Sequence, residues 1–241
     1  MDIAVFSTPA LVAQATANKI LAFIQSKPNA LLCLAGGDSP RLTYQYLAAA
    51  VKSSGTNCGR LQFVSLDEWV GIPPTNTGSC FYFLQETIFG PLAIPPVNIH
   101  FFNSSATDLT AECNRIDKII AQLQGIDVLL AGIGLNGHIG FNEPGLPQAS
   151  AHVTELDSLT QQVGQKYFEQ NASLQYGITQ GMAQLLQSKT ILLLATGTKK
   201  AAIVQQALEE KMTDAVPASL LRQHSNAFAL LDREAAALLT Q

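Results

Sequence analysis

The stretch that decides the fold is Asp127-Val128-Leu129-Leu130-Ala131-Gly132-Ile133, a mainly apolar run that ends in a glycine-rich loop at Gly134. A run without polar alternation is typical of a strand in a parallel sheet, because helices bury both faces of such a sheet. The turn-forming residues that bound the run support this interpretation. Other runs of the same kind are expected to form the remaining strands: 30–34, 61–66 and 190–195, with shorter ones at 3–6 and 227–231.

The segments between these runs carry apolar residues at three- and four-residue spacing, which is typical of amphipathic helices. The expected helices are 11–25, 42–52, 109–123 and 200–210, with a short one at 179–186. Alternating strands and helices predict a Rossmann-like α/β fold, with a mostly parallel sheet flanked by helices on both faces. The chain has 241 residues, of which 47% are hydrophobic and 13% charged. This size and composition suit a single domain over residues 1–241.

The charge and the apolar runs argue against nucleic-acid and membrane partners. With a net charge of -4 and a pI near 5.5, the chain offers no broad basic surface to nucleic acid or anionic lipid. Its apolar runs are far shorter than the roughly 20 residues that a membrane span needs. The N-terminus lacks the features of a signal peptide, so we expect a cytoplasmic protein.

The cysteines and three of the four histidines show no functional spacing. No pattern of zinc ligands or of a disulfide framework is present, so no metal site is expected and the cysteines should be reduced structural thiols. Cys80 is distinguished only by its closeness to an acidic motif. The other residues of this group are Cys33, Cys58, Cys113, His100, His152 and His224.

Four segments of unusual composition follow the expected strands, and we expect each of them to be a loop. In an open parallel sheet, ligands bind in the crevice beyond the carboxyl ends of the strands. If the strands are parallel, these segments should therefore meet at one rim of the sheet although they are far apart in sequence. They are 36–40, 67–69, 134–145 and 196–200.

The most informative of these segments is 134–145, which places His138 between glycines. Asn136 lies two residues before the histidine and Glu143 five residues after it. A carboxylate can hold an imidazole in one tautomer and raise its basicity, which suits proton transfer near neutral pH. The segment also matches GxGxxG, but the turn-forming Asn-Glu-Pro-Gly that follows leaves no helix for a dinucleotide. The plainer alternative is a surface histidine.

Two adjacent carboxylates, Asp67 and Glu68, follow the expected strand 61–66. An acidic pair at the end of a buried strand is costly to bury without a function. Either carboxylate could remove a proton from carbon. Alternatively, one of the pair caps the next segment and the other faces water.

Two segments have the character of phosphate loops. Gly36, Gly37, Asp38 and Ser39 lie between a strand and a helix, where backbone N–H groups and a hydroxyl can face an anion. The alternative is an ordinary tight turn in which Ser39 caps the helix. Lys200, after the strand 190–195, could pair with a phosphate or simply face solvent. Neither segment is a Walker A motif, so a nucleoside triphosphate is not implied.

Together these segments resemble the glucosamine-6-phosphate deaminase family, which shares a fold with 6-phosphogluconolactonases. Residues 66–71, Leu-Asp-Glu-Trp-Val-Gly, resemble the family element L-D-E-[YW]-x-G. Residues 132–144 resemble the longer element G-[IV]-G-x-[DN]-G-H-[IL]-x-[FL]-N-E-P. The segments 177–181 and 217–226 resemble the branch labelled galactosamine-6-phosphate isomerase/deaminase.

The resemblance implies isomerisation and deamination of a hexosamine 6-phosphate, without a metal or cofactor. Asp67 would move a proton between C2 and C1 of the open-chain sugar, and Glu68 would act at the amino or hydroxyl end. His138 would open the ring, supported by the remaining residues of its loop. The implied supports and phosphate ligands are Asn136 and Glu143 for the histidine, and Gly36, Gly37, Asp38, Ser39 and Lys200 for the phosphate.

Three positions depart from the family pattern. Asn136 stands where many members have aspartate, which leaves Glu143 as the one charged support of the histidine. Lys166 stands where many members carry an arginine that reaches the phosphate, so a bidentate contact becomes a point-charge contact. Asp38 would lie close to a phosphate, which requires that its side chain point away.

Two other functions remain as alternatives. A 6-phosphogluconolactonase is a hydrolase that needs the histidine and the phosphate site but no base for C2, and its loop lacks the carboxylate of Glu143. A non-catalytic sugar-phosphate sensor would normally carry a DNA-binding domain ahead of the fold, which this sequence does not show. Whether the sugar is a galactosamine or a glucosamine stays open, and we expect a monomer or small homo-oligomer.

Overall fold

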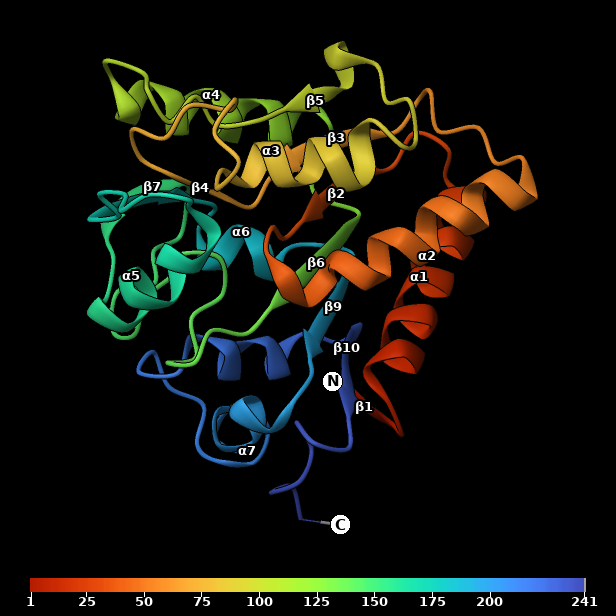
Figure 1. The fold of residues 1–241 in the computed structure, drawn as a ribbon, viewed down its shortest axis with the longest axis vertical. Coiled ribbons are helices and arrows are strands. Elements are labelled where there is room, and N and C mark those ends of the chain that lie inside the picture. The colour runs from red at the N-terminus through yellow and green to blue at the C-terminus, as the bar shows by residue number, and fades with distance from the viewer. Residues whose placement is uncertain (241) are drawn as a thin grey trace.

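The computed structural model describes residues 1–240, and a seven-stranded sheet forms its centre (Figure 1). The strand order is β1-β10-β9-β6-β2-β3-β5, and every neighbouring pair is parallel. The strands are β1 (Asp2–Phe6), β2 (Leu31–Leu34), β3 (Gln62–Ser65), β5 (Ile99–His100), β6 (Val128–Gly132), β9 (Thr190–Ala195) and β10 (Ala227–Asp232).

The central strands are apolar throughout because both faces of the sheet are covered. Side chains alternate between the faces, so Leu129 and Leu193 join one hydrophobic cluster and Val128 and Leu192 join the other. One face is covered by α1 (Pro9–Ser26), α2 (Asp38–Ser54) and α3 (Cys80–Leu84), which runs into a π-helical turn at Gln85–Phe89. The other face carries α4 (Leu109–Gln122), α6 (Met182–Leu186), α7 (Ala201–Glu209) and the 3-10 helix Pro217–Gln223.

A second, three-stranded sheet lies at the edge of this core. It is antiparallel, in the order β4-β8-β7, and consists of β4 (Asp67–Trp69), β8 (Tyr176–Thr179) and β7 (His152–Glu155). Figure 1 shows β4 and β7 above α5 (Ser158–Gly164), on the side of the molecule away from α1 and α2. Trp69 anchors this part by packing its ring on Phe141, with centroids 4.6 Å apart.

The predicted fold class is confirmed: a single-domain α/β fold with a mostly parallel sheet and helices on both faces. All six predicted strands and the four longer predicted helices are present within a few residues of their expected bounds. All four cysteines are free, as predicted. In the described part of the chain, no helix is long and apolar enough to cross a bilayer.

Two local predictions were wrong. The segment 179–186 is not one helix, because Thr179 ends β8 by pairing with Asp67 and His152, and α6 begins only at Met182. The segment 67–69 is not a loop, because it pairs with β8 as the short strand β4. Both errors have the same cause, since the small sheet joins residues more than 100 positions apart.

Candidate active site

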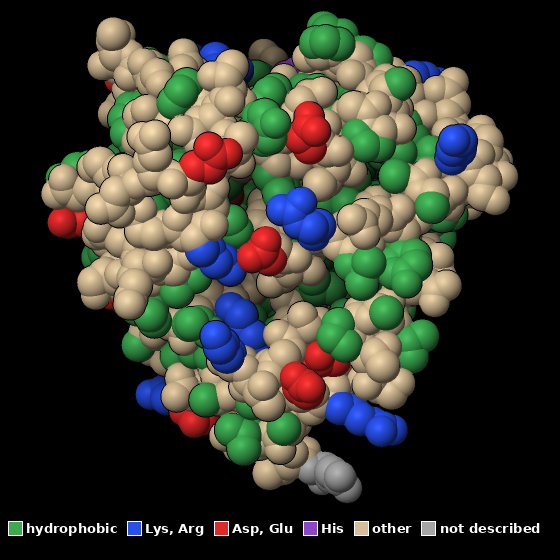
Figure 2. Space-filling model, viewed as in Figure 1, with side chains coloured by type: hydrophobic (Ala, Val, Ile, Leu, Met, Phe, Trp, Pro, Cys, Tyr) green, Lys and Arg blue, Asp and Glu red, His purple; other side chains and the backbone are tan. Residues whose placement is uncertain are grey.

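The four segments predicted to share a rim all contribute to one cleft at the carboxyl ends of the central strands. The cleft has a volume of about 420 Å³ and is lined by residues 36–41, Asp67, 132–136, His138 and Lys200, with α5 and the turn after it on the far side. In Figure 2, Lys and Arg side chains gather around a hollow near the centre of the face, with an acidic side chain between them. The predicted meeting of these segments is therefore observed.

His138 lies in the loop after β6, and glycines fix its position. A Cβ atom on Gly134 would lie 2.5 Å from the imidazole atoms Cε1 and Nδ1, so the ring packs directly on that glycine. Gly137 has a φ of 88°, a left-handed conformation that glycine adopts without strain. The Oδ1 atom of Asn136 accepts a hydrogen bond from the His138 N–H at 3.3 Å. The loop contains no helix.

Glu143 contacts the Nδ1 side of the His138 imidazole. Its Oε2 lies 3.5 Å from Nδ1 of His138 and accepts a hydrogen bond from Asn136 Nδ2 at 2.8 Å. Thr160 Oγ1, on α5, lies 3.1 Å from the same Nδ1. Burial alone would raise the pKa of Glu143, but the hydrogen bond and charge of His138, with Thr160 and Asn136, hold that pKa below its usual value. An ionised carboxylate thus faces Nδ1, which leaves Nε2 for a substrate.

Asp67 lies in the cleft at the start of β4. Burial raises its pKa to about 6, although a hydrogen bond from Cys80 and the charge of His138 act in the opposite direction. The Asp67 carboxyl is therefore mostly ionised at neutral pH. Its pKa is also close to neutral pH, which suits a general base.

Glu68 is buried, with 2% of its surface exposed, and does not line the cleft. Its carboxylate accepts hydrogen bonds from the backbone N–H groups of Trp69, Cys80 and Phe81, at 2.9, 3.0 and 2.9 Å. Burial raises its pKa to about 7 in spite of these bonds. The structure therefore separates the two adjacent carboxylates: Asp67 faces the cleft, and Glu68 holds the first turn of α3.

The glycine-rich turn 36–39 opens helix α2 toward the cleft. Gly37 precedes the helix with a φ of 94°, and no side chain caps the first turn. Ser39 lines the cleft and is exposed. Uncapped N–H groups at a helix start and a free hydroxyl are suitable partners for a phosphate.

Lys200 completes this end of the cleft. Its Nζ donates a hydrogen bond to the carbonyl of Ile133, at the base of the histidine loop. Burial, followed by the charge of Lys166, lowers its pKa to about 8. The segment before it is shaped by Asp232, which accepts hydrogen bonds from the Gly197 N–H at 3.0 and 3.1 Å.

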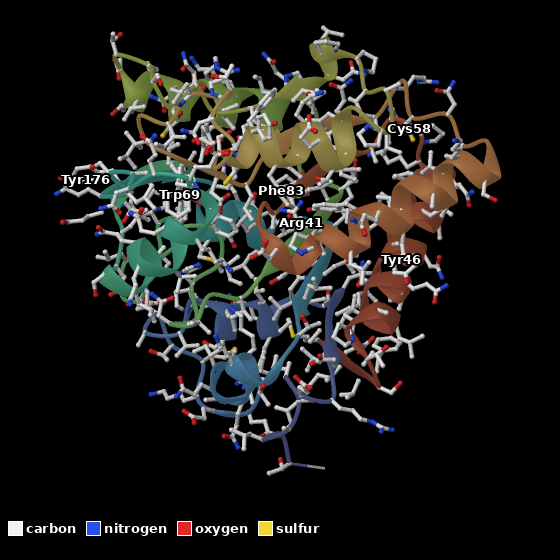
Figure 3. All side chains as sticks on the ribbon, viewed as in Figure 1. Arg41, Tyr46, Cys58, Trp69, Phe83 and Tyr176 are labelled. Carbon is white, nitrogen blue, oxygen red and sulfur yellow. The ribbon has the colours of Figure 1, made fainter. Side chains whose placement is uncertain are left out.

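Asp38 lines the cleft and pairs with two cationic side chains. Its carboxylate lies 2.9 Å from Nζ of Lys166 and 3.9 Å from the Arg41 guanidinium, with 57% of the side chain exposed. Arg41 was not among the predicted site residues, and its guanidinium also lies over the Phe83 ring at 4.7 Å (Figure 3). Its position three residues after Asp38, on the same helix face, was the available signal. Thr160 was also missed, because nothing in the sequence ties α5 to the histidine.

Among residues 1–240, no three His, Cys, Asp or Glu side chains are grouped as ligands of a metal ion. The three remaining histidines hydrogen-bond groups outside the cleft: His100 contacts Gln62, His152 the Ser150 carbonyl and His224 the Ser188 carbonyl. The cleft thus combines the His138 imidazole, which contacts a buried carboxylate, with the Asp67 carboxylate and the Lys200 ammonium group. This combination is suited to proton transfer on a substrate that carries an anionic group.

Comparison with known proteins identifies the family to which the chain is similar. Residues 7–230 match the family described as glucosamine-6-phosphate isomerases/6-phosphogluconolactonase. A glucosamine-6-phosphate deaminase of Geobacillus sp. (strain WCH70) is 38% identical over 230 residues, which cover 95% of this chain and 92% of the relative. A protein of Escherichia coli (strain K12) named as a deaminase, AgaI, is 40% identical over 214 residues, which cover 88% and 84%.

A solved structure described as a monomeric glucosamine-6-phosphate deaminase is similar over its whole length. It is 35% identical to this chain, has a TM-score of 0.95, and the match covers 99% of this chain and 100% of that one. The chain belongs to the glucosamine-6-phosphate isomerase/6-phosphogluconolactonase family. The predicted resemblance is confirmed, and the protein is an enzyme.

Proposed function

We propose that the enzyme converts a hexosamine 6-phosphate and water into a ketohexose 6-phosphate and ammonia. One observation carries the proposal: Asp67 and His138, whose imidazole contacts the buried Glu143, line the same cleft as the 36–39 turn and Lys200. A lactonase needs a histidine and a phosphate site but has no use for a base at C2. The names of the deaminase relatives support the same choice.

The proposed reaction begins with ring opening. Nε2 of His138 takes the proton of the C1 hydroxyl and gives it to the ring oxygen, and Glu143 stabilises the positive charge that the imidazole carries between the two transfers. Asp67 then takes the proton from C2 of the open-chain aldose and returns it to C1. This proton transfer leaves an imine at C2, to which water adds. The resulting carbinolamine expels ammonia once its nitrogen is protonated, and a C2 ketone remains.

The phosphate is bound at the other end of the cleft. Ser39 and the N–H groups of Gly36, Gly37 and Asp38 would hold its oxygens, and Lys200 would pair with its charge. Lys166 is proposed to approach as a point charge while it stays paired with Asp38. Binding energy from this remote group would orient C2 and the ring oxygen for proton transfer.

The test is ammonia release from glucosamine 6-phosphate and from galactosamine 6-phosphate, measured by a coupled assay with the wild type and Asp67→Asn. We expect release from at least one sugar and a loss of about 100-fold or more in kcat for the variant, which is within the contribution of a general base. Asp108→Asn is the matched control, because Asp108 caps α4, away from the cleft, and asparagine caps equally well. Release that is unchanged in Asp67→Asn would refute the assignment.

The same experiment addresses the alternatives. Hydrolysis of 6-phosphogluconolactone without ammonia release would identify a lactonase. Tight binding of a phosphosugar without turnover would identify a sensor. The ratio of kcat/KM for the two amino sugars would assign the configuration at C4.

The proposal extends to the setting of the enzyme. We propose a small phosphosugar as its one partner, without nucleic acid, membrane, metal or cofactor, and a monomer or small homo-oligomer that works in the cytoplasm. The monomeric state named for the similar solved structure supports the assembly.

A further inference from the structure

Thr179 is a buried residue of the small sheet that lies directly opposite Asp67. It ends β8, and in the antiparallel pairing of β4 with β8 its partner is Asp67. None of its surface is exposed, and it does not line the cleft. The side chain therefore does not reach a substrate, and any effect that it has on the reaction must pass through the groups around it.

The hydroxyl of Thr179 connects the backbone of the histidine loop with the backbone that leads into β4. Its Oγ1 accepts a hydrogen bond from the Phe141 N–H at 3.1 Å, three residues after His138. The same oxygen lies 3.3 Å from the carbonyl oxygens of Leu66 and Gln180, and it can donate its one proton to either. Since Leu66 comes immediately before the proposed base, one hydroxyl joins the supports of both catalytic groups.

Gly140 allows the histidine loop to approach this hydroxyl closely. A Cβ atom on Gly140 would lie 2.7 Å from Oγ1 of Thr179 and 3.3 Å from the side chain of Leu66. The φ of Gly140 is 57°, a left-handed conformation that glycine adopts without strain. The loop thus packs directly on the threonine, and the position of the hydroxyl limits how near the loop can come to the strand.

A second set of hydrogen bonds holds the same segments together without the threonine hydroxyl. The Gln180 N–H donates to the Leu66 carbonyl at 2.8 Å, and Nε2 of Gln180 donates to the Ser65 carbonyl at 2.9 Å. Nδ2 of Asn142 donates to the carbonyls of Gln180 and Ile139, at 2.8 and 2.9 Å. Loss of the hydroxyl should therefore leave the loop attached to β8 and change only its exact distance from β4.

From these contacts we propose that Thr179 is a positioning residue, whose hydroxyl sets the distance between the Asp67 carboxylate and the His138 imidazole. The proposal rests on the proposed function, in which both groups act on one sugar. A misplacement of about 1 Å can lower a rate about 100-fold, so a residue that joins the supports of both groups can control the rate without touching the substrate. The proposal also assigns a role to the segment 177–181, which resembles one branch of the family although none of its residues lines the cleft.

The experiment compares kcat and KM for ammonia release in Thr179→Val, Thr179→Ser and the wild type. Valine keeps the branched shape of threonine but can neither accept from the Phe141 N–H nor donate to a carbonyl. Its kcat should fall about 10- to 100-fold, while KM should change little because the phosphate turn and Lys200 are untouched. Serine keeps the hydroxyl and should restore most of the wild-type kcat.

Thr16→Val is the matched control. Thr16 is also fully buried, its hydroxyl donates to the Val12 carbonyl at 2.7 Å within α1, and it does not line the cleft. This variant should keep the wild-type kcat. The proposal is overturned if Thr179→Val keeps the wild-type kcat, if serine loses as much kcat as valine, or if the control loses as much as Thr179→Val.

Two additions keep the test decisive. Should the valine variant not fold, Thr179→Cys takes its place, because a thiol is a weaker donor and acceptor than a hydroxyl; a kcat for cysteine at or above that of serine would overturn the proposal. Amide hydrogen exchange at Phe141 does not depend on activity and should be faster in Thr179→Val than in Thr179→Ser. If the wild type releases no ammonia but the exchange differs in this way, the hydroxyl contact stands and the proposed function fails.

Discussion

Glu143→Gln is the substitution that most directly tests the histidine assembly, because the carboxylate of Glu143 accepts hydrogen bonds from several directions. Asn136 Nδ2 donates to Oε2 at 2.8 Å, and the Asp157 N–H donates to Oε1 at 3.3 Å. The His138 ring lies 3.5 Å from Oε2. A glutamine has one acceptor oxygen and one NH2 group, so its NH2 must face one of these donors. The variant therefore loses a charge beside the imidazole and gains a buried clash of donors.

Two effects of this change can be given magnitudes. A hydrogen bond to a charged group contributes about 1.5–3 kcal/mol, which corresponds to a factor of about 10 to 100 in a rate. We expect kcat for ammonia release to fall by about this factor, because the imidazole loses the charge that stabilises its protonated form. The unsatisfied donor should lower the free energy of unfolding by about 1–3 kcal/mol.

The stability effect also depends on pH. The pKa of Glu143 is held below its usual value in the folded protein, so its contribution to stability is present above the unfolded pKa of about 4.5 and is lost as the pH falls through the folded pKa. Glu143→Gln should therefore be less stable than the wild type at pH 7, with a smaller difference in acid, as thermal or urea unfolding would show.

Glu112→Gln is the control for these measurements. Glu112 is a buried glutamate paired with Arg115 at 2.7 Å, outside the cleft, and the pKa of its carboxyl is likewise lowered, by Arg115 and the Asn103 N–H against the effect of burial. It should lose stability and keep its kcat. The reasoning about Glu143 is refuted if its glutamine variant keeps kcat/KM within twofold of the wild type, or if both variants lose activity to the same extent.

Two further predictions concern the phosphate end and the histidine loop. Burial and the charge of Lys166 lower the pKa of Lys200 to about 8, so kcat/KM should fall above pH 8 as the lysine loses its charge. In Lys200→Arg this decrease in kcat/KM should occur at higher pH. A decrease at the same pH in both proteins would exclude Lys200 as its source. Gly134→Ala puts a Cβ atom 2.5 Å from the His138 ring and should reduce kcat by about 100-fold, the effect of misplacing a catalytic group by about 1 Å. Its control is Gly132→Ala, where a Cβ atom would meet nothing within 4 Å; equal kcat in the two variants would contradict the packing argument.

The central sheet could be predicted because burial on both faces leaves an unbroken apolar pattern in the sequence. The small sheet could not, since β4 is the three-residue sequence Asp-Glu-Trp and its partner β8 lies more than 100 residues away. Neither the spacing of apolar residues nor the strand propensity of three residues distinguishes such a strand from a loop. The strand is formed by pairing with Thr179 and Ile178, and the local sequence around residues 67–69 does not encode these distant contacts.

The strand β4 also explains why the sequence alone did not show which of Asp67 and Glu68 faces the cleft. Successive side chains of a strand point to opposite faces, so only one of Asp67 and Glu68 can reach the cleft. Both carboxylates were predicted to act in catalysis, with the alternative that one of them caps the next segment. The position of Glu68, which caps α3, agrees with that alternative. Recognition of 67–69 as a strand would have decided between the two carboxylates.

Burial has opposite effects on the pKa values of Asp67 and Lys200, and we predict that these two groups set the pH range of ammonia release. Desolvation disfavours the charged form of either group, so it raises the pKa of Asp67 to about 6 and lowers that of Lys200 to about 8. Between these values Asp67 is ionised and Lys200 is charged, which is the state that the proposed proton abstraction and phosphate binding require. Because both limits come from one enclosed cleft, a variant that opens it to solvent should widen the range on both sides.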